Sequence, residues 1–247
     1  MTDYDDGHFD EAIAAEYDEG AAYMFAPQVL GPTVDLLERL AGGGRVLEFA
    51  IGTGRVALPL AARGVEVHGI EMSRPMVAAM RAKLGGADLP VAIGDMTYER
   101  VEGEFSLVYL VYNTIGNVLT QDGQVAVFEN AARHLVPGGR FLIEIEVPAL
   151  RRLPQGERYV AFNLLPGYAG VDEYDTVSQS LLSHHISVRA DGTGTENVTP
   201  QRYVWPSELD LMARIAGMTL ENRWEDFEGT PFTSESQKHV SVWVKED

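Results

Sequence analysis

From residue 44 to residue 147 the chain repeats one unit, an apolar run of strand length followed by a turn and a stretch with helical spacing of apolar side chains. The runs that we expect to form buried strands are Arg45–Ile51, Val65–Glu71, Pro90–Gly94, Phe105–Tyr112 and Arg140–Val147. The helices expected between them include Arg55–Arg63, Met76–Leu84 and Asp122–Leu135. Parallel neighbours in a sheet require a crossover connection, so this alternation predicts an α/β fold with a doubly wound, mostly parallel sheet.

The pattern changes after Leu150 to short alternating runs joined by Gly, Pro and Asp turns, which is typical of antiparallel strands. These runs are Glu157–Asn163, Asp175–Val188 and Glu196–Val204, with a hairpin signal at Asp191–Gly194. A helix at Pro206–Ala216 and two closing strands at Met218–Phe227 and Lys238–Lys245 bring the main sheet to seven strands. The expected domains are an N-terminal helical lid region at 1–43, a core at 44–150 and 205–247, and an antiparallel insert at 151–204.

Composition excludes several classes of protein. The chain has no cysteine, so it forms no disulfide and no thiolate metal site, and no other spacing suggests metal ligands. With 37 acidic and 19 basic residues its net charge of -18 disfavours binding to nucleic acid or to an anionic membrane surface. No apolar run reaches the roughly 20 residues that span a bilayer, and the N-terminus lacks the features of a signal peptide. We therefore expect a cytoplasmic protein with neither a nucleic acid nor a membrane as partner.

The segment EFAIGTGRVA, residues 48–57, joins the first strand to the first helix through a glycine turn. Glycines at 52 and 54 allow a tight turn and a close approach of the backbone to a ligand. By itself the pattern fits a dinucleotide, S-adenosylmethionine (SAM), or a turn with no ligand. Glu71, at the end of the second strand, suits ribose hydroxyls in either kind of nucleotide site.

Three features favour SAM over a dinucleotide. Glu48 lies just before the turn, where a dinucleotide site must accommodate a charged pyrophosphate. Asp95, after the third strand, places a carboxylate where an adenine amino group would lie. The chain ends in one helix and two strands, which leaves no second domain for a nicotinamide substrate.

These residues resemble class I (Rossmann-like) SAM-dependent methyltransferases of the small-molecule, secondary-metabolite type, similar to the amino-sugar N-methyltransferases. Ala50 stands where the family motif has its first glycine, a departure that adds one methyl group. The resemblance implies that the turn lines the methionine moiety, that Glu71 binds the ribose, and that the segment after the fourth strand passes beneath the sulfonium. The cofactor-binding residues implied in this way are Tyr17 (as a lid residue), Glu48, Ala50, Gly52, Gly54, Glu71, Met72, Asp95, Met96, Leu110 and Tyr112.

Candidates for the chemical step are fewer. Asn113, in the segment that follows the fourth strand, and Glu146, at the end of the fifth, belong to the edge of the sheet where α/β folds bind ligands. Successive side chains of a strand point to opposite faces, so at most one of the adjacent His184 and His185 can point into a given cleft. We take His185 as the third catalytic candidate. Aromatic residues of the insert could line a substrate pocket or fill the core beneath it; they are Tyr159, Phe162, Tyr168, Tyr174 and Tyr203.

The sequence thus predicts a SAM-dependent methyltransferase that acts on N or O of a small molecule, such as a sugar or another secondary metabolite. A non-catalytic SAM-binding module and an NAD-dependent oxidoreductase are the alternatives. Inserts of this kind in the family also serve dimerisation, so the resemblance implies a homodimer formed through residues 151–204.

Overall fold

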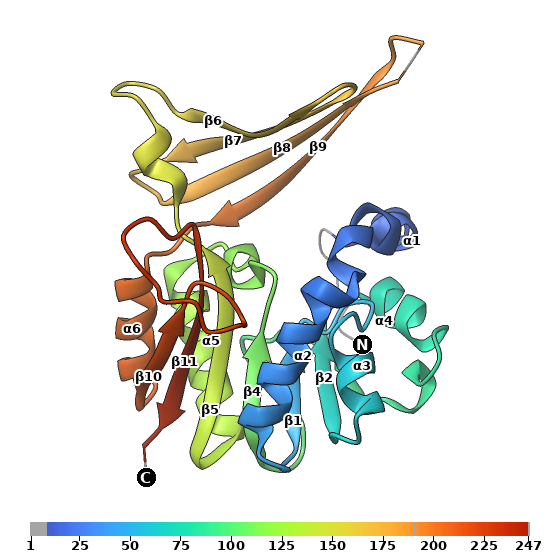
Figure 1. Ribbon diagram of the computed structural model, residues 1–247, viewed down its shortest axis with the longest axis vertical. Helices are drawn as coiled ribbons and strands as arrows, with labels where there is room; N and C mark the ends of the chain where they lie inside the picture. Colours follow the sequence, from blue (N-terminus) through green and yellow to red (C-terminus); the bar gives the residue numbers. More distant parts are fainter. Residues whose placement is uncertain (1–8, 190, 247) are drawn as a thin grey trace.

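The main sheet of the computed structural model, which describes residues 9–189 and 191–246, has the strand order β10-β11-β5-β4-β1-β2-β3 (Figure 1). Its strands are β1 (Val46–Phe49), β2 (Val67–Glu71), β3 (Val91–Ile93), β4 (Phe105–Leu110), β5 (Leu135–Glu146), β10 (Met218–Trp224) and β11 (Lys238–Lys245). Neighbours among β1 to β5 are parallel, whereas β11 is antiparallel to both β5 and β10. The expected seven-stranded, mostly parallel sheet is therefore confirmed.

Helices cover both faces of this sheet. They are α2 (Pro27–Ala41), α3 (Ala57–Ala62), α4 (Arg74–Arg81), α5 (Gln121–His134) and α6 (Pro206–Ile215), whereas α1 (Glu11–Gly20) packs against α4 above the carboxyl ends of the strands (Figure 1). Short 3-10 turns are η1 (Ala22–Phe25), η2 (Gly86–Asp88), η3 (Thr114–Asn117) and η4 (Ala149–Arg152). Val46 packs with α2, α3 and α4 on one face, and its neighbour Leu47 packs with α5 and α6 on the other. Successive side chains of a strand alternate in direction, so each buried strand contributes to both cores.

Two expected helices prove shorter in the structure. The first begins at Ala57 instead of Arg55, because residues 52–56 remain in turns. The second ends at Arg81 instead of Leu84, and it begins where the Ser73 hydroxyl accepts a hydrogen bond from Met76 N at 3.2 Å. This short α4 is the helix against which the glycine turn packs.

The insert forms a separate antiparallel sheet, with the order β6-β7-β8-β9, above the carboxyl ends of the parallel strands (Figure 1). Its strands are β6 (Tyr159–Leu165), β7 (Tyr168–Asp175), β8 (Ser180–Val188) and β9 (Gly194–Arg202). The expected strand Asp175–Val188 was wrong at its start, because Asp175 Oδ1 accepts from Val177 N and Gln179 has a φ of 57°, which make a turn there. The residues before that turn form β7, a strand that the sequence pattern did not predict. The hairpin at Asp191 is confirmed by the hydrogen bond from Arg189 N to Thr193 O.

Candidate functional site

A cavity of about 670 Å³ lies between the carboxyl ends of the parallel strands, α1 and the insert sheet. Its volume falls within the range typical of small-molecule sites, roughly 300 to 1,000 Å³. One end is lined by residues that follow β1, β2 and β3, and the other by residues that follow β4 and by β8 and β9. The cavity therefore joins the main sheet to the insert.

The glycine turn forms part of the first end. Ala50 and Gly52 line the cavity, and both have left-handed backbone, with φ of 51° and 56°. Gly54 has φ of 78° but does not line the cavity; a Cβ on it would lie 2.7 Å from Met80 Cγ. Gly52 thus leaves room for a ligand, whereas Gly54 lets the turn pack against α4.

Glu71 is the buried carboxylate of this end, with 7% of its surface exposed. Its Oε2 accepts from Gly52 N at 2.7 Å and its Oε1 from Ser73 N at 2.9 Å. Burial raises the pKa of Glu71, and these backbone donors oppose the rise. The contacts fix the carboxylate beside the turn, and Met72 lines the cavity next to it.

Asp95 and Met96 line the same end after β3. Asp95 Oδ1 accepts a hydrogen bond from Thr97 N at 2.8 Å. This bond forms a turn that fixes the Asp95 carboxylate in the wall of the cavity. Met96 packs against the core below it, and its carbonyl accepts from Asn130 Nδ2 at 2.9 Å. Two carboxylates and an apolar floor thus frame a space suited to an adenosine.

Glu48 and Leu110 lie behind the cavity wall, although the family resemblance implied contact with the cofactor. Glu48 is 3% exposed and accepts a hydrogen bond from Tyr109 Oη at 2.8 Å, and burial raises its pKa to about 8. Leu110 has no exposed surface and belongs to the core under α5. In β4 the alternation of side chains points Leu110 into that core, and the chain reaches the cavity only at Tyr112.

Helix α1 covers one side of the cavity. Tyr17 and Phe9 both line it and meet edge to face with their ring centroids 6.0 Å apart. Asp18 holds α1 to the glycine turn, because its Oδ1 accepts from Thr53 Oγ1 at 2.6 Å and its Oδ2 pairs with Lys83. Burial raises the pKa of Tyr17. Residues 1–8 of the expected lid region lie outside the described residues.

The segment after β4 separates two of the residues expected at the site. Tyr112 and Asn113 both have left-handed backbone, with φ of 63° and 58°. Tyr112 lines the cavity, while Asn113 turns away and accepts from Glu146 N through its Oδ1 at 2.6 Å. Asn113 and Glu146 line a separate hollow of about 40 Å³ beside Tyr174. Loss of surrounding water raises the pKa of Glu146, but its carboxylate is not part of the large cavity.

His185 lines the cavity from the insert. Its Nδ1 and the hydroxyl of Tyr168 are 2.7 Å apart, and its ring meets that of Phe162 at 5.5 Å between centroids. Gly170 makes this arrangement feasible, since a Cβ there would lie 2.3 Å from the Phe162 ring. His184 points to the opposite face of the sheet, where its Nδ1 lies 2.7 Å from Glu196 Oε1. The expected opposite orientation of the two histidines is confirmed.

Several cavity residues had no signal in the sequence. They are Asn117, Val118 and Leu119 after β4, and Thr199, Pro200 and Gln201 of β9. The register that pairs Ser183 with Thr199 decides which side chains of β9 face inward, and no local pattern specifies that register. None of the five aromatic residues expected for a substrate pocket lines the large cavity, and Tyr174 and Tyr203 instead pack together in the insert's own core.

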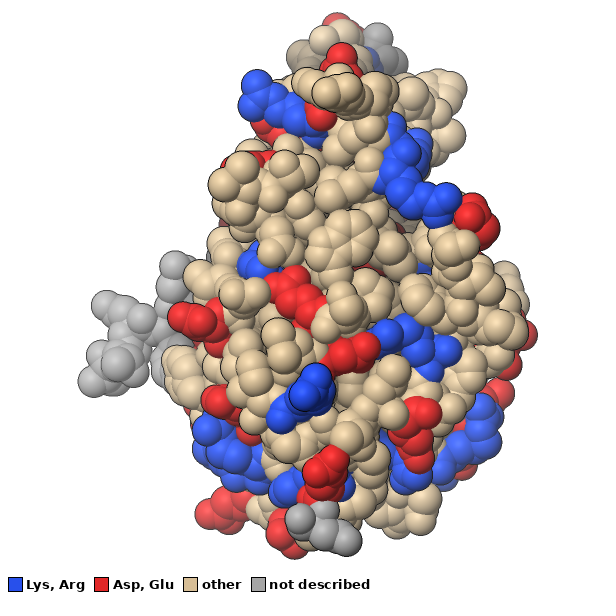
Figure 2. Space-filling view, turned by 90° about the vertical axis from the view of Figure 1, so that its left-hand side faces the viewer, with Lys and Arg blue, Asp and Glu red and all other residues tan. Residues whose placement is uncertain are grey.

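Within the described residues, no group of three His, Asp or Glu side chains is arranged to hold a metal ion. Over the same residues, no helix combines the length and the apolar character needed to cross a bilayer. On the face shown in Figure 2, acidic and basic side chains are interspersed, and they form no continuous basic surface there.

Comparisons with known proteins agree with this architecture. Residues 46–139 match the family model described as a methyltransferase domain. The chain is 34% identical to the CcbJ methyltransferase of Streptomyces caelestis, whose structure is similar with a TM-score of 0.85 over 99% of this chain and 100% of that one. The chain belongs to the class I SAM-dependent methyltransferases.

Other relatives are similar over most of their length. This methyltransferase is 28% identical to the cypemycin N-terminal methyltransferase of a Streptomyces species, over 92% of this chain and 96% of that one. The SAM-bound amino pentose methyltransferase CalS10 of Micromonospora echinaspora has the same fold, with 20% identity and a TM-score of 0.69 over 92% of this chain and 96% of that one. The cofactor of the methyltransferase is SAM, and Gly52, Glu71 and Asp95 are the residues of the cavity that could hold its adenosine.

Proposed function

We propose that the protein transfers the methyl group of SAM to a nitrogen of a small molecule of secondary metabolism, with an oxygen acceptor as the alternative. The observation that carries the proposal is that the cavity continues past its cofactor end. Its far end is lined by uncharged polar groups, among them Thr114, Asn117, Thr199 and Gln201. A volume of about 670 Å³ leaves space for an acceptor of modest size beside the cofactor.

The lining of the cavity favours a neutral acceptor or an amine over an anion. Among the described residues that line it, none is Lys or Arg, and the carboxylates are those of Glu71 and Asp95. A phosphate or carboxylate group on the acceptor would lose its hydration there with no Lys or Arg in the lining to pair with it, at a cost of several kcal/mol, on the order of the penalty for burying an ion. The net charge of -18 adds to this preference.

The relatives support nitrogen as the methylated atom. The cypemycin enzyme is named for an N-terminal amine, and the solved structures of similar fold include the sugar N-methyltransferase KedS8 of Streptoalloteichus and the glycopeptide N-methyltransferase MtfA. A sugar carrying an amino group is therefore the first substrate class to test. Carbon acceptors receive less support from these names.

His185 is the proposed proton acceptor. When bound, SAM would supply a methyl group on a sulfonium, so that the acceptor lone pair would form the bond to carbon and the electron pair of the broken C–S bond would stay on sulfur. The amine must reach this step without its extra proton, and an imidazole in the cavity wall can take it. Tyr168 orients that imidazole through the 2.7 Å contact with Nδ1. We favour His185 over Glu146 because Glu146 lies in the smaller hollow with Asn113.

The test begins with calorimetry of the purified protein against SAM, S-adenosylhomocysteine (SAH) and NADH. A screen of amino sugars, their hydroxyl analogues and short peptides for a mass gain of one methylene unit follows. Transfer to an amine and none to its hydroxyl analogue supports the proposal. Binding of SAM with no transfer to any acceptor would instead favour a SAM-binding module.

Two matched variants test the base. His185→Gln should lower turnover by about 10² to 10⁴, the usual contribution of general base catalysis, while leaving SAH affinity unchanged. His184→Gln, on the opposite face of the same strand, should keep parental turnover. Equal turnover in both variants would remove His185 from the mechanism, and Glu146→Gln then becomes the next variant to measure.

We also propose that residues 151–204 serve as the substrate-binding insert on a core of 44–150 and 205–247, with the N-terminal helices as a lid, and that the insert mediates a homodimer. Its outer strand β6 leaves Leu164 and Leu165 exposed, which supports an interface there. Light scattering after size exclusion measures the mass directly, and a mass of one chain of 27.1 kDa would rule out the dimer.

A further inference from the structure

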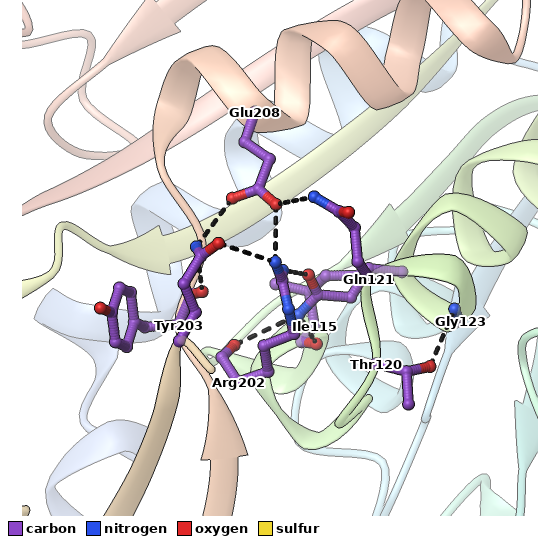
Figure 3. Close-up of polar contacts among 9 residues, drawn as sticks. Ile115, Thr120, Gln121, Gly123, Arg202, Tyr203 and Glu208 are labelled. Atoms are coloured by element: carbon purple, nitrogen blue, oxygen red, sulfur yellow. Dashed lines mark hydrogen bonds and ion pairs between the residues drawn. The ribbon is translucent and has the colours of Figure 1, made fainter. Parts of the chain in front are cut away.

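Arg202, the last residue of β9, is a buried cation at the junction of the insert and the core, with 5% of its surface exposed (Figure 3). Its guanidinium donates to Gln124 Oε1 at 2.5 Å, to Gln179 Oε1 at 3.0 Å and to Glu208 Oε1 at 2.7 Å. These partners come from α5, from the turn between β7 and β8, and from α6. One side chain therefore joins three segments that are far apart in the sequence.

Gln124 connects this cluster to η3. It has no exposed surface, and its Nε2 donates to Ile115 O at 3.1 Å and to Arg202 O at 3.2 Å. The backbone of η3 also lies directly against β9, since a Cβ on Gly116 would be 3.7 Å from both Arg202 O and Gln201 Cβ. Arg202 and Gln124 thus hold η3 and the end of β9 in contact.

Both of these segments carry the far wall of the cavity. Thr114 and Asn117 belong to η3, and Thr199 and Gln201 immediately precede Arg202 in β9. None of the cluster residues Gln124, Gln179, Arg202 and Glu208 lines the cavity. The opposite end, with Gly52, Glu71 and Asp95, is built on other strands and shares no residue with the cluster.

We infer that Arg202 and Gln124 are positioning residues that set the gap between η3 and the insert sheet, and with it the fit of the methyl acceptor. This rests on the proposed function, which assigns the acceptor to that end of the cavity. Directional hydrogen bonds to a buried ion pair hold one arrangement of the surrounding segments, which an apolar contact does less strictly. The insert strands extend away from this junction, so a small rotation at Arg202 moves the distant part of the sheet (Figure 1).

The experiment compares Gln124→Met with Gln121→Met, two identical substitutions in the same helix. Gln121 is exposed and donates to Glu208 Oε1, and without it Glu208 still accepts hydrogen bonds from Arg202 and Gln179. The chain has no cysteine, so spin labels at Leu84→Cys on the core and Val188→Cys on the insert, in samples diluted with unlabelled protein, report the distance within one chain. Both positions are exposed, at 100% and 50%, and neither belongs to β6.

In Gln124→Met we expect the label distance, measured with SAH bound, to shift or broaden. The acceptor KM should rise by about tenfold to a hundredfold, the scale for a misplacement of about 1 Å, while SAM KM and SAH affinity stay at the parental values. Gln121→Met should match the parent in every measurement. Arg202→Lys, which keeps a cation opposite Glu208 but loses the donation to Gln124, provides a second variant and should change in the same direction.

Parental distances and parental acceptor KM in Gln124→Met would overturn the inference. A parallel loss of SAH affinity would overturn it as well, because it would show a general structural defect instead of a change confined to the acceptor end. If the parent itself binds SAH but methylates no acceptor, the proposed function fails, and the label distances still decide whether the junction positions the insert.

Discussion

Ala50→Gly should stabilise the folded protein. Ala50 replaces a glycine of the family motif, and the structure shows that the cost is in the backbone, since Ala50 has a φ of 51°. A non-glycine residue in the left-handed region loses roughly 1 to 2 kcal/mol relative to its preferred conformation. Glycine avoids that loss but makes the unfolded chain more flexible, which costs about 0.4 to 1 kcal/mol.

The difference between these two effects is a gain of about 0 to 1.6 kcal/mol in the free energy of unfolding, with a middle value of about 0.8 kcal/mol. For a chain of 247 residues this corresponds to a rise in Tm of about 1.5 to 3 °C. Thermal unfolding followed by circular dichroism, without cofactor, measures it. The cofactor is left out because Ala50 lines the cavity and its methyl group could alter binding.

Ala61→Gly in α3 is the matched control, because Ala61 is helical and lacks left-handed backbone. There glycine should destabilise the protein by about 0.5 to 1 kcal/mol. Opposite signs for the two Ala→Gly changes support the reasoning. A fall in Tm for Ala50→Gly of the same size as for Ala61→Gly would refute it.

Three further changes test other parts of the site. Gly54→Ala should destabilise the protein by about 2 to 5 kcal/mol in urea unfolding, because it adds left-handed strain to a contact of 2.7 Å with Met80; a variant as stable as the parent would contradict the packing role. Asp95→Ala should weaken SAM binding by about 1 to 3 kcal/mol in calorimetry, and unchanged affinity would remove Asp95 from the site. Glu48 has a folded pKa of about 8 against an ordinary value of 4.5, so its protonated form is favoured in the folded state and the unfolding free energy should fall as pH rises from 4.5 to 8. Glu48→Gln should remove this component of the slope while retaining an acceptor for Tyr109, and an unchanged pH profile would show that Glu48 ionises normally.

The sequence could predict that Gly52, Glu71 and Asp95 lie together at one cavity, because these residues stand at the ends of parallel strands. Glu71 and Asp95 each come at such an end, and the carboxyl ends of parallel strands share one edge of the sheet. Their position in space therefore follows from the order of strands and turns. The same holds for Gly52 in the turn after β1.

The remaining residues depend on geometry that a local pattern does not contain. Glu48 and Leu110 belong to strands whose ends border the cavity, but their side chains are buried in the core. Tyr112 and Asn113 are neighbours, and two successive left-handed residues send one into the cavity and the other to Glu146. Positive φ in non-glycine residues is uncommon and has no sequence signature strong enough to predict it here.

The insert shows the same limit at a larger scale. Three of its four strands are recognisable in the sequence and β7 is not, and the pairing that brings Thr199 and Gln201 to face the cavity follows from the register of β8 and β9. A shift by one residue would turn every side chain of β9 to the other face. That register is held at its end by Arg202, whose buried partners lie 78 and 6 residues away in the chain.

Thr53 belongs to the turn that borders the cofactor end, and it also holds Asp18 of α1. The contact between α1 and this turn is therefore linked to the binding of a ligand in the cavity. Thermodynamic linkage is reciprocal, so a ligand that favours the closed turn tightens α1 by the same free energy with which a closed α1 tightens the ligand. The affinity of the cavity for its ligand therefore depends in part on the hydroxyl of Thr53, a residue that does not itself line the cavity.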